Sequence, residues 1–398
     1  MKKTIRKIIR RLTLFVLRGF SLLNRVLPKN SQRNLIFTFN KGFNDNNRAL
    51  FEYLVENGYN KQYLIIYSLP EYQILKRRGK INGVRFIPCW QAPFIFLFAK
   101  YCFYDTGTLN IKPAEGQIVI QLWHGTPLKK LDKTVNNDTI KGDHYDDFTY
   151  AICCADIVKP LLANAFECSV EKIVVTGYPR NDNLFNQADY VNLLGIERDK
   201  YKKLIFWMPT FRIAMNGRHV DSVVEQGNTT GLQLFGTEDA LQELNAFLWE
   251  HQFYLVIKLH PLAALNNLKY VTFSNMFILN NECMNKLAVQ NYKLLSNFDA
   301  LITDYSSVYF DWLLIGRPLG FVVEDMASYG SMRGFAFEEP LKYMPGMKIQ
   351  TKADFFEFCE NASTDDAFRQ ERSDMCRLFN AYQDDKSSER VLKLAGIN

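Results

Sequence analysis

Residues 300–314 read ALITDYSSVYFDWLL, and they contain the pattern from which the fold class can be predicted. The apolar run 300–303 predicts a buried strand, residues 308–314 predict a helix, and a polar turn lies between them. The same order of strand, polar turn and helix recurs along the chain. Because strands that are apolar throughout and alternate with helices form parallel sheets covered on both faces, we expect an α/β protein.

On both sides of this stretch, the predicted strands and helices form two series along the chain. The first predicts strands and helices at residues 35–39, 46–57, 63–68, 71–78, 84–88, 91–99, 101–105, 117–123, 157–166 and 173–178. The second predicts them at residues 203–208, 238–251, 253–259, 284–295, 300–303, 308–314 and 319–323, before C-terminal helices at 353–360, 368–382 and 388–395. We expect two doubly wound Rossmann-like domains, 31–198 and 199–398, facing each other across a cleft. The polar stretch 214–231 is expected to be a mobile loop near a site.

The composition limits the class of protein. The 398 residues are 47% hydrophobic and 23% charged, which favours ordered domains over disorder, and no apolar run is long enough to span a bilayer. The eight cysteines show no C-x-x-C spacing, so we expect reduced thiols rather than disulfides or a zinc site. The chain also lacks G-x-x-x-x-G-K-[ST], G-x-G-x-x-G and Asp-x-Asp. We therefore expect no P-loop, no dinucleotide cofactor and no bound metal.

The net charge of +6 comes from one end of the chain. Residues 1–30 hold nine Lys or Arg and no acid, whereas the other residues hold 39 basic and 42 acidic side chains. A nucleic-acid-binding body is therefore not expected. Within 1–30, apolar residues at three- and four-residue spacing predict an amphipathic helix with a cationic face.

We expect this helix to hold the protein at an anionic membrane surface as a peripheral protein, on the cytoplasmic face of the cell membrane. Two alternatives remain. The helix could pack on the body of the protein, or it could be a secretory signal. Against the signal, Arg18 and Arg25 interrupt the apolar region and no small-residue cleavage site follows.

Ligands of parallel sheets bind beyond the carboxyl ends of the strands, and polar residues follow five predicted strands. These segments are residues 123–127, 177–182, 209–212, 258–261 and 303–307. His124 ends a strand and precedes Gly125, so its imidazole could accept a proton from a hydroxyl. The alternative is a histidine that only orders the turn.

Cationic and hydroxyl side chains in the other segments favour an anionic ligand. Lys258 and His260 alternate with Leu259 and should project on one face, although a surface pair is the alternative. Ser306 and Ser307 precede a helix, where hydroxyls and free amides could bind phosphate; ordinary capping would need one serine. Asp311, one helical turn on, could reach the same ligand.

Arg180 has two interpretations of equal weight. Its guanidinium could bind a phosphate through two nitrogen atoms. Alternatively, it starts a helix after Pro179, with Asn181 and Asp182 as caps.

At these residues the sequence resembles the CDP-glycerol glycerophosphotransferase family of teichoic-acid primases and polymerases. The resemblance is carried by QLWHGTPLKKL (121–131), GYPRND (177–182), PTFR (209–212), KLHP (258–261), ITDYSSVYFDWLL (302–314) and RGF (333–335). The resemblance implies a GT-B-like fold and metal-independent transfer of a polyol phosphate from a CDP-polyol to a hydroxyl, with release of CMP. The acceptor would be built on a polyprenyl diphosphate lipid, in teichoic acid or capsule-type polymer synthesis.

The resemblance also implies roles for particular residues. His124 matches the proposed base, and His260 would stabilise the departing CMP. Positions that match those holding the donor are Gly125, Thr126, Pro127, Leu128, Arg180, Pro209, Thr210, Lys258, Leu259, Ser306, Ser307 and Asp311.

Three other functions stay open. The family includes relatives that use CDP-ribitol instead of CDP-glycerol. A GT-B glycosyltransferase would move a sugar and release a nucleoside diphosphate. A membrane-surface scaffold would use the basic helix alone and leave the strand-end residues without a role.

Overall fold

The structure is a computed structural model that describes residues 16, 19–38, 42–106, 109–131, 147–210, 227–259, 272–280, 283–284, 287, 289–362 and 366–397. Its contacts divide the chain into two compact units. Unit 1 comprises Met1–His124, Asn137–Asp182 and Asp384–Asn398, and unit 2 comprises Gly125–Asn136 and Asn183–Gln383. The predicted ranges, 31–198 and 199–398, differ from this division at three places. They assign residues 125–136 and 183–198 to the first domain and the last helix to the second.

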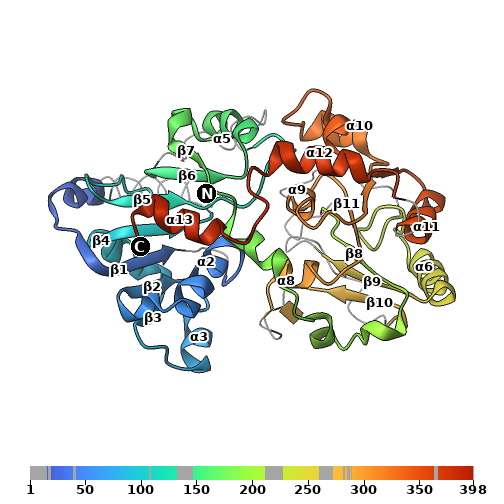
Figure 1. Ribbon diagram of the computed structural model, residues 1–398, viewed down its shortest axis with the longest axis horizontal. Coiled ribbons are helices and arrows are strands. Elements are labelled where there is room, and N and C mark those ends of the chain that lie inside the picture. The colour runs from blue at the N-terminus through green and yellow to red at the C-terminus, as the bar shows by residue number, and fades with distance from the viewer. Residues whose placement is uncertain are drawn as a thin grey trace, which may run out of the picture. The chain divides into compact units, whose positions relative to one another are not determined.

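Unit 1 is built on a seven-stranded sheet in which every pairing is parallel (Figure 1). Its strands are β1 (Asn30–Thr38), β2 (Leu64–Ser68), β3 (Val84–Ile87), β4 (Ala99–Tyr104), β5 (Ile118–Gln121), β6 (Tyr150–Cys153) and β7 (Ile173–Val175). The order β3-β2-β1-β4-β5-β6-β7 reverses direction between β1 and β4, as in doubly wound nucleotide-binding folds.

Helices join these strands and cover the sheet. They are α2 (Asp45–Glu56), α3 (Tyr72–Arg78), α4 (Ala92–Phe96), α5 (Lys159–Phe166) and α13 (Ser387–Ala395). The C-terminal α13 contacts α2, and the Asp182 carboxylate accepts the N–H groups of Ser387 and Ser388 at 2.8 Å each. This cap explains why the last helix belongs to unit 1, although it follows unit 2 in the sequence.

Unit 2 repeats the same plan with six parallel strands (Figure 1). They are β8 (Lys203–Trp207), β9 (Phe253–Lys258), β10 (Met276–Leu279), β11 (Ala300–Thr303), β12 (Leu319–Val322) and β13 (Met347–Ile349). The order β10-β9-β8-β11-β12-β13 reverses between β8 and β11. The predicted doubly wound α/β architecture is thus confirmed in each sheet.

Helices connect the strands of unit 2, and two of them begin at side-chain caps. They are α6 (Glu238–His251), α8 (Asn291–Leu295), α9 (Val308–Trp312), α10 (Met326–Met332), α11 (Lys352–Asn361) and α12 (Arg369–Phe379). Thr351 and Asp354 form a capping box at α11, and the Thr237 side chain accepts the Ala240 N–H at α6. Phe355 of α11 packs on Trp207 with ring centroids 5.1 Å apart, which anchors α11 to the core.

The sequence prediction missed β6, β10, β13 and α10, which are short and carry little periodic pattern. Most of the predicted N-terminal helix and of the loop 214–231 lies outside the described residues. Within 1–30, residues 19–26 are helical and expose Leu22, Leu23 and Val26. Among the residues that the structure describes, no helix combines the length and apolar character that crossing a bilayer requires.

Candidate active site

In both units the reversal of strand order marks where a ligand crevice is expected, outside the carboxyl ends of the strands. In unit 1 the residues there are Asp45–Asn47, at the start of α2, and Asp105, directly after β4. In unit 2 they are Thr210, after β8, and Asp304–Ser307, after β11. Thr210, Ser306 and Ser307 therefore lie at the reversal point of unit 2, and His124 and Lys258 follow or end the neighbouring strands β5 and β9.

His124 lies on a sharp turn that leaves its imidazole exposed. β5 ends at Gln121, whose Oε1 accepts the Trp123 N–H at 3.0 Å. Trp123 has φ +53° and Gly125 has φ +135°, so two of three consecutive residues adopt a conformation that L side chains rarely take. The Trp123 ring is buried, and its centroid lies 3.9 Å from the centroid of the His124 ring. This packing directs the histidine toward solvent.

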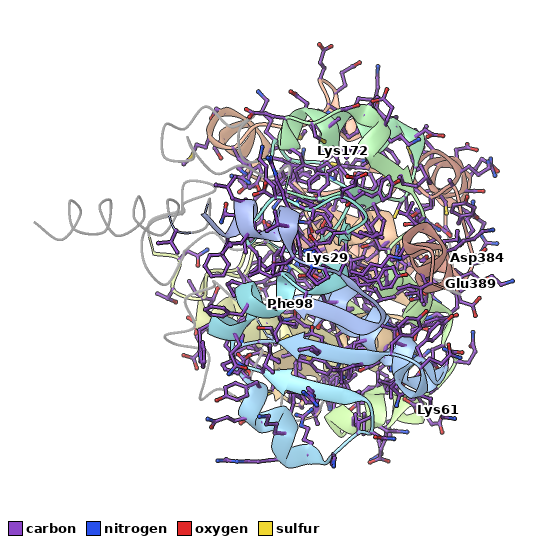
Figure 2. All side chains as sticks on the ribbon, turned by 90° about the vertical axis from the view of Figure 1, so that its left-hand side faces the viewer. Lys29, Lys61, Phe98, Lys172, Asp384 and Glu389 are labelled. Atoms are coloured by element: carbon purple, nitrogen blue, oxygen red, sulfur yellow. The ribbon has the colours of Figure 1, made fainter. Side chains whose placement is uncertain are left out.

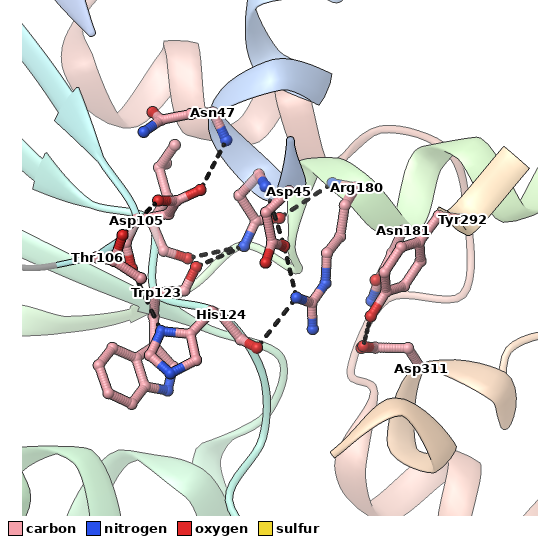
Figure 3. Close-up of polar contacts among 12 residues, drawn as sticks. Asp45, Asn47, Asp105, Thr106, Trp123, His124, Arg180, Asn181, Tyr292 and Asp311 are labelled. Carbon is pink, nitrogen blue, oxygen red and sulfur yellow. Dashed lines mark hydrogen bonds and ion pairs between the residues drawn. The ribbon is translucent and has the colours of Figure 1, made fainter. Parts of the chain in front are cut away.

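Three consecutive carbonyl groups of this turn are held by side chains from distant segments. The Asn46 amide donates to Leu122 O at 3.1 Å and to Trp123 O at 2.7 Å. Arg180 Nη1 donates to His124 O at 3.0 Å (Figure 3). Because buried carbonyls without donors are costly, these bonds fix the backbone on which the histidine sits.

Asp45, Asn46 and Arg180 also hold one another. Arg180 Nη1 donates to Asp45 Oδ1 at 2.6 Å, and Arg180 N donates to Asn46 Oδ1 at 3.1 Å. Only 4% of the Arg180 side chain is exposed, and its guanidinium lies 5.4 Å from the centre of the Tyr178 ring. The contacts of Arg180 are therefore those of a residue that positions the His124 turn, and its predicted contact with a donor stays a prediction.

The imidazole of His124 has a defined neighbour on one side. Its Nδ1 lies 3.4 Å from the backbone oxygen of Asp105 (Figure 3). A carbonyl oxygen can only accept, so this contact favours the tautomer with hydrogen on Nδ1. Nε2 then carries the lone pair that a general base needs.

Asp105, directly after β4, is buried, and its side chain lies at the N-terminus of α2. Its carboxyl group accepts the Asn47 N–H at 3.4 Å and the Thr106 hydroxyl at 3.2 Å. Burial, with a smaller contribution from Asp45, raises the pKa of Asp105 well above its usual range. This carboxyl group occupies the helix N-terminus where nucleotide-binding folds commonly place a phosphate.

In unit 2 the loops after β8 and β11 are bonded to each other. Thr210 donates to Asp304 Oδ2 from its N–H at 2.8 Å and from its hydroxyl at 2.7 Å. The Thr303 hydroxyl donates to Met208 O at 2.8 Å. Pro209 and Thr210 are buried, so this pairing gives the edge of the sheet a fixed shape.

Ser306 and Ser307 are half-buried in front of α9. Ser307 is the N-cap residue, yet its side chain makes no capping hydrogen bond, unlike Thr237 at α6. This observation argues against ordinary capping by the Ser307 side chain, and the ligand role of the two serines stays a prediction. Asp311 is fully buried, and its Oδ2 accepts the Tyr292 hydroxyl at 2.5 Å (Figure 3).

Lys258 is the last residue of β9 and is 4% exposed. Burial lowers its pKa to about 8, and Nζ donates to Leu259 O at 3.1 Å. The Leu259 side chain packs in the core, as expected. His260 lies outside the described residues.

The segment after His124 belongs to unit 2. Its residues Gly125, Thr126, Pro127 and Leu128 are buried. The structure thus brings His124 and Arg180 together in unit 1, and Thr210 and the Asp304 loop together in unit 2. The expected cleft between the two halves stays a prediction. No cluster of three His, Cys, Asp or Glu suited to a metal is found within the described ranges.

Three functional candidates were missed by the sequence prediction, namely Asp45, Asn46 and Asp105. Asp105 is the last residue of the predicted strand 101–105, so a search that included the last residue of each strand would have found it. Asp45 and Asn46 are the first two residues of α2 and resemble ordinary residues of a helix N-terminus. Their bonds to residues 76 to 135 positions away leave no local signal.

Comparison with known proteins identifies the family. A sequence model described as "CDP-Glycerol:Poly(glycerophosphate) glycerophosphotransferase" matches residues 20–395. The chain is 27% identical over 422 residues to the teichoic acid glycerol-phosphate transferase of Staphylococcus aureus (strain NCTC 8325 / PS 47), covering 98% of each. It is 29% identical over 291 residues to the teichoic acid ribitol-phosphate primase of Bacillus spizizenii (strain ATCC 23059 / NRRL B-14472 / W23), covering 69% of this chain and 68% of the primase.

Solved structures of the wall teichoic acid polymerase TagF share the fold. One variant superposes with a TM-score of 0.73 at 23% identity, covering 100% of this chain and 97% of that one. Another TagF variant, soaked with CDPG, superposes with a TM-score of 0.71 at 22% identity, covering 100% of this chain and 98% of that one.

Proposed function

The chain belongs to the CDP-glycerol:poly(glycerophosphate) glycerophosphotransferase family, and on that basis we propose that it transfers glycerol phosphate from CDP-glycerol to a hydroxyl of a lipid-linked acceptor. The nucleotide product is CMP. The observation that carries this proposal is the fixed turn of His124, whose Nδ1 faces a backbone oxygen and whose ring is exposed.

In the proposed reaction His124 Nε2 takes the proton of the acceptor hydroxyl. The hydroxyl oxygen forms a bond to the β-phosphorus of CDP-glycerol, the bond from that phosphorus to the bridging oxygen breaks, and CMP leaves with the electron pair. General-base assistance of this kind typically contributes about a hundredfold to ten-thousandfold in rate.

The donor would be held by unit 2 residues. Ser306 and Ser307 would donate hydrogen bonds from their hydroxyl groups, and the Ser307 side chain makes no capping hydrogen bond. Lys258 would supply a positive charge. His260 would stabilise the departing CMP. This arrangement suits a diphosphate, since its charge develops on the leaving oxygen as the bond breaks.

A second donor, CDP-ribitol, is favoured by one specific observation. The ribitol-phosphate primase of Bacillus spizizenii is 29% identical to this chain over 69% of its length, and the glycerol-phosphate transferase of Staphylococcus aureus is 27% identical over 98%. The motif residues contact the shared parts of both donors in this proposal, so they do not separate glycerol from ribitol.

We also propose that the protein acts at the cytoplasmic face of the membrane, where a lipid-linked acceptor would be found. Support comes from the face of unit 1 shown in Figure 2, on which Lys29 and Phe98 lie. Leu22, Val26, Phe94 and Phe98 are all about half exposed or more, at 65%, 78%, 52% and 46%. The Phe20 and Phe94 rings pack 5.4 Å apart, so helix residues 19–26 and α4 form one apolar surface. In the sequence this helix directly follows residues 1–18, which carry seven Lys or Arg and no acid.

One assay tests the reaction. The protein is incubated with CDP-glycerol or CDP-ribitol and a lipid-linked acceptor, and the released nucleotide and the product length are measured. CMP released with only one CDP-polyol identifies the donor. Release of a nucleoside diphosphate from a nucleotide sugar, with no reaction of either CDP-polyol, would replace this proposal by glycosyl transfer.

A further inference from the structure

The RGF run at residues 333–335 has no part in the chemistry proposed above, yet unit 2 pairs it with the segment that follows His124. Lys130 N donates to Gly334 O at 3.1 Å, and Ala336 N donates to Leu128 O at 2.8 Å. Lys129 and Phe335 form the antiparallel bridge between these two bonds. The two segments are about 200 residues apart in sequence, and neither is a strand of the six-stranded sheet.

The side chain of Phe335 extends this pairing to the loop that carries the two serines. Its ring centroid lies 5.3 Å from that of Tyr305, the residue directly before Ser306. Tyr305 and Tyr329 are fully buried with their ring centroids 4.4 Å apart. The Tyr305 hydroxyl donates to Asp325 Oδ1 at 3.1 Å, and Gln233 Nε2 donates to the same oxygen at 3.1 Å.

Gly334 is required by the close approach of the two segments. Its φ of +78° is one that L side chains rarely adopt. A Cβ at this position would also lie 2.9 Å from Cδ of Lys130. The Lys129 ammonium lies 5.5 Å from the centre of the Tyr329 ring, which joins the segment after His124 to α10 as well.

We propose that residues 333–335 are positioning residues that clamp the segment 125–128 to the Ser306–Ser307 loop. The clamp consists of the backbone pairing of 128–130 with 334–336 and the Phe335–Tyr305 contact. This inference rests on the proposed function, in which both segments hold the CDP-polyol donor. The clamp orders both segments before the donor binds. Binding then loses less conformational entropy, so the clamp increases the affinity for the donor.

The test compares two glycines with the same backbone strain in full-length protein. Gly334→Ala introduces both the strain and the contact with Lys130, whereas Gly316→Ala introduces strain at φ +74° in open space. Isothermal titration with CDP-glycerol and CDP-ribitol should give about tenfold weaker binding for Gly334→Ala and unchanged binding for Gly316→Ala. The double variant Lys130→Ala/Gly334→Ala should bind the donor more tightly than Gly334→Ala, because the side chain that the new Cβ meets is gone.

Hydrogen exchange supplies a readout that needs no donor. Gly334→Ala should speed amide exchange in peptides covering 125–131 and 303–310, and Gly316→Ala should not. Unchanged affinity and unchanged exchange in Gly334→Ala would overturn the clamp. If the wild-type protein bound neither CDP-polyol, the proposed function would fail, and the exchange result alone would decide the clamp.

Discussion

The two units share one strand order but differ in what stands at the point where it reverses. In unit 1 a buried carboxyl group, Asp105, occupies the N-terminus of α2, and side-chain donors bind the carbonyls of the His124 turn. In unit 2 Lys258 loses hydration by burial, and the Ser307 hydroxyl has no capping bond. The fold sets the place of a site, and the side chains decide whether that place holds a base or an anion.

The first test of this difference is the base itself. His124→Ala should lower CMP release by about a hundredfold to ten-thousandfold, because in the proposed reaction the His124 imidazole takes the acceptor proton. His251→Ala is the matched control, since His251 lies at the end of α6 and pairs with Glu360. Turnover is measured as CMP released per enzyme at saturating donor. Near-normal turnover by His124→Ala would remove this residue from the role.

The second test concerns the bonds that hold the turn. Asn46→Ala leaves two buried carbonyls without their amide donor, and we expect turnover to fall about tenfold to a hundredfold as the turn relaxes. Asn57→Ala, at the exposed end of the same helix, serves as the control. Steady-state kinetics with donor and acceptor varied in turn measures the effect. If only the KM for the donor rises and turnover is unchanged, Asn46 contributes to donor binding and not to the position of the His124 turn.

Much of the fold was predictable because its signal is local. β11 and α6 have the bounds expected from their apolar patterns, whereas β6 and β13, with four and three residues, were missed. His124 and Ser306 were predicted as site residues because each follows an apolar strand, and the structure places both after strands. The role of Asn46 was not found, since it depends on carbonyl groups 76 and 77 positions away, and no pattern in the neighbouring sequence reports them.

The third test uses the pH dependence of the cation in unit 2. Burial lowers the pKa of Lys258 to about 8, so its charge is present below that pH and is lost as the pH rises. If the charged form binds the donor, affinity for CDP-glycerol should fall about tenfold between pH 7 and pH 9. Titration calorimetry over this range measures it. Lys258→Gln should bind more weakly throughout and show no such fall; a variant with the same pH profile as wild type would assign the titration to another group.

The smallest effect is expected on the apolar surface of unit 1 that residues 19–26 and α4 form. Leu22→Ser/Val26→Ser should lower binding to anionic vesicles by about threefold to tenfold, because two exposed apolar side chains no longer enter the lipid. Leu193→Ser, an exposed leucine of unit 2, is the control. Sedimentation with vesicles measures the bound fraction. Equal sedimentation of all three proteins would exclude this surface from membrane attachment.

The assignment of the base to unit 1 and of the donor phosphates to unit 2 is tested by measuring the dissociation constant of CDP-glycerol for two variants side by side. For His124→Ala we predict a value within about threefold of wild type, and for Ser306→Ala/Ser307→Ala a value raised about tenfold or more, since each lost hydroxyl removes a hydrogen bond to a charged group. The opposite result, with affinity lost in His124→Ala and kept in the double serine variant, would contradict the account.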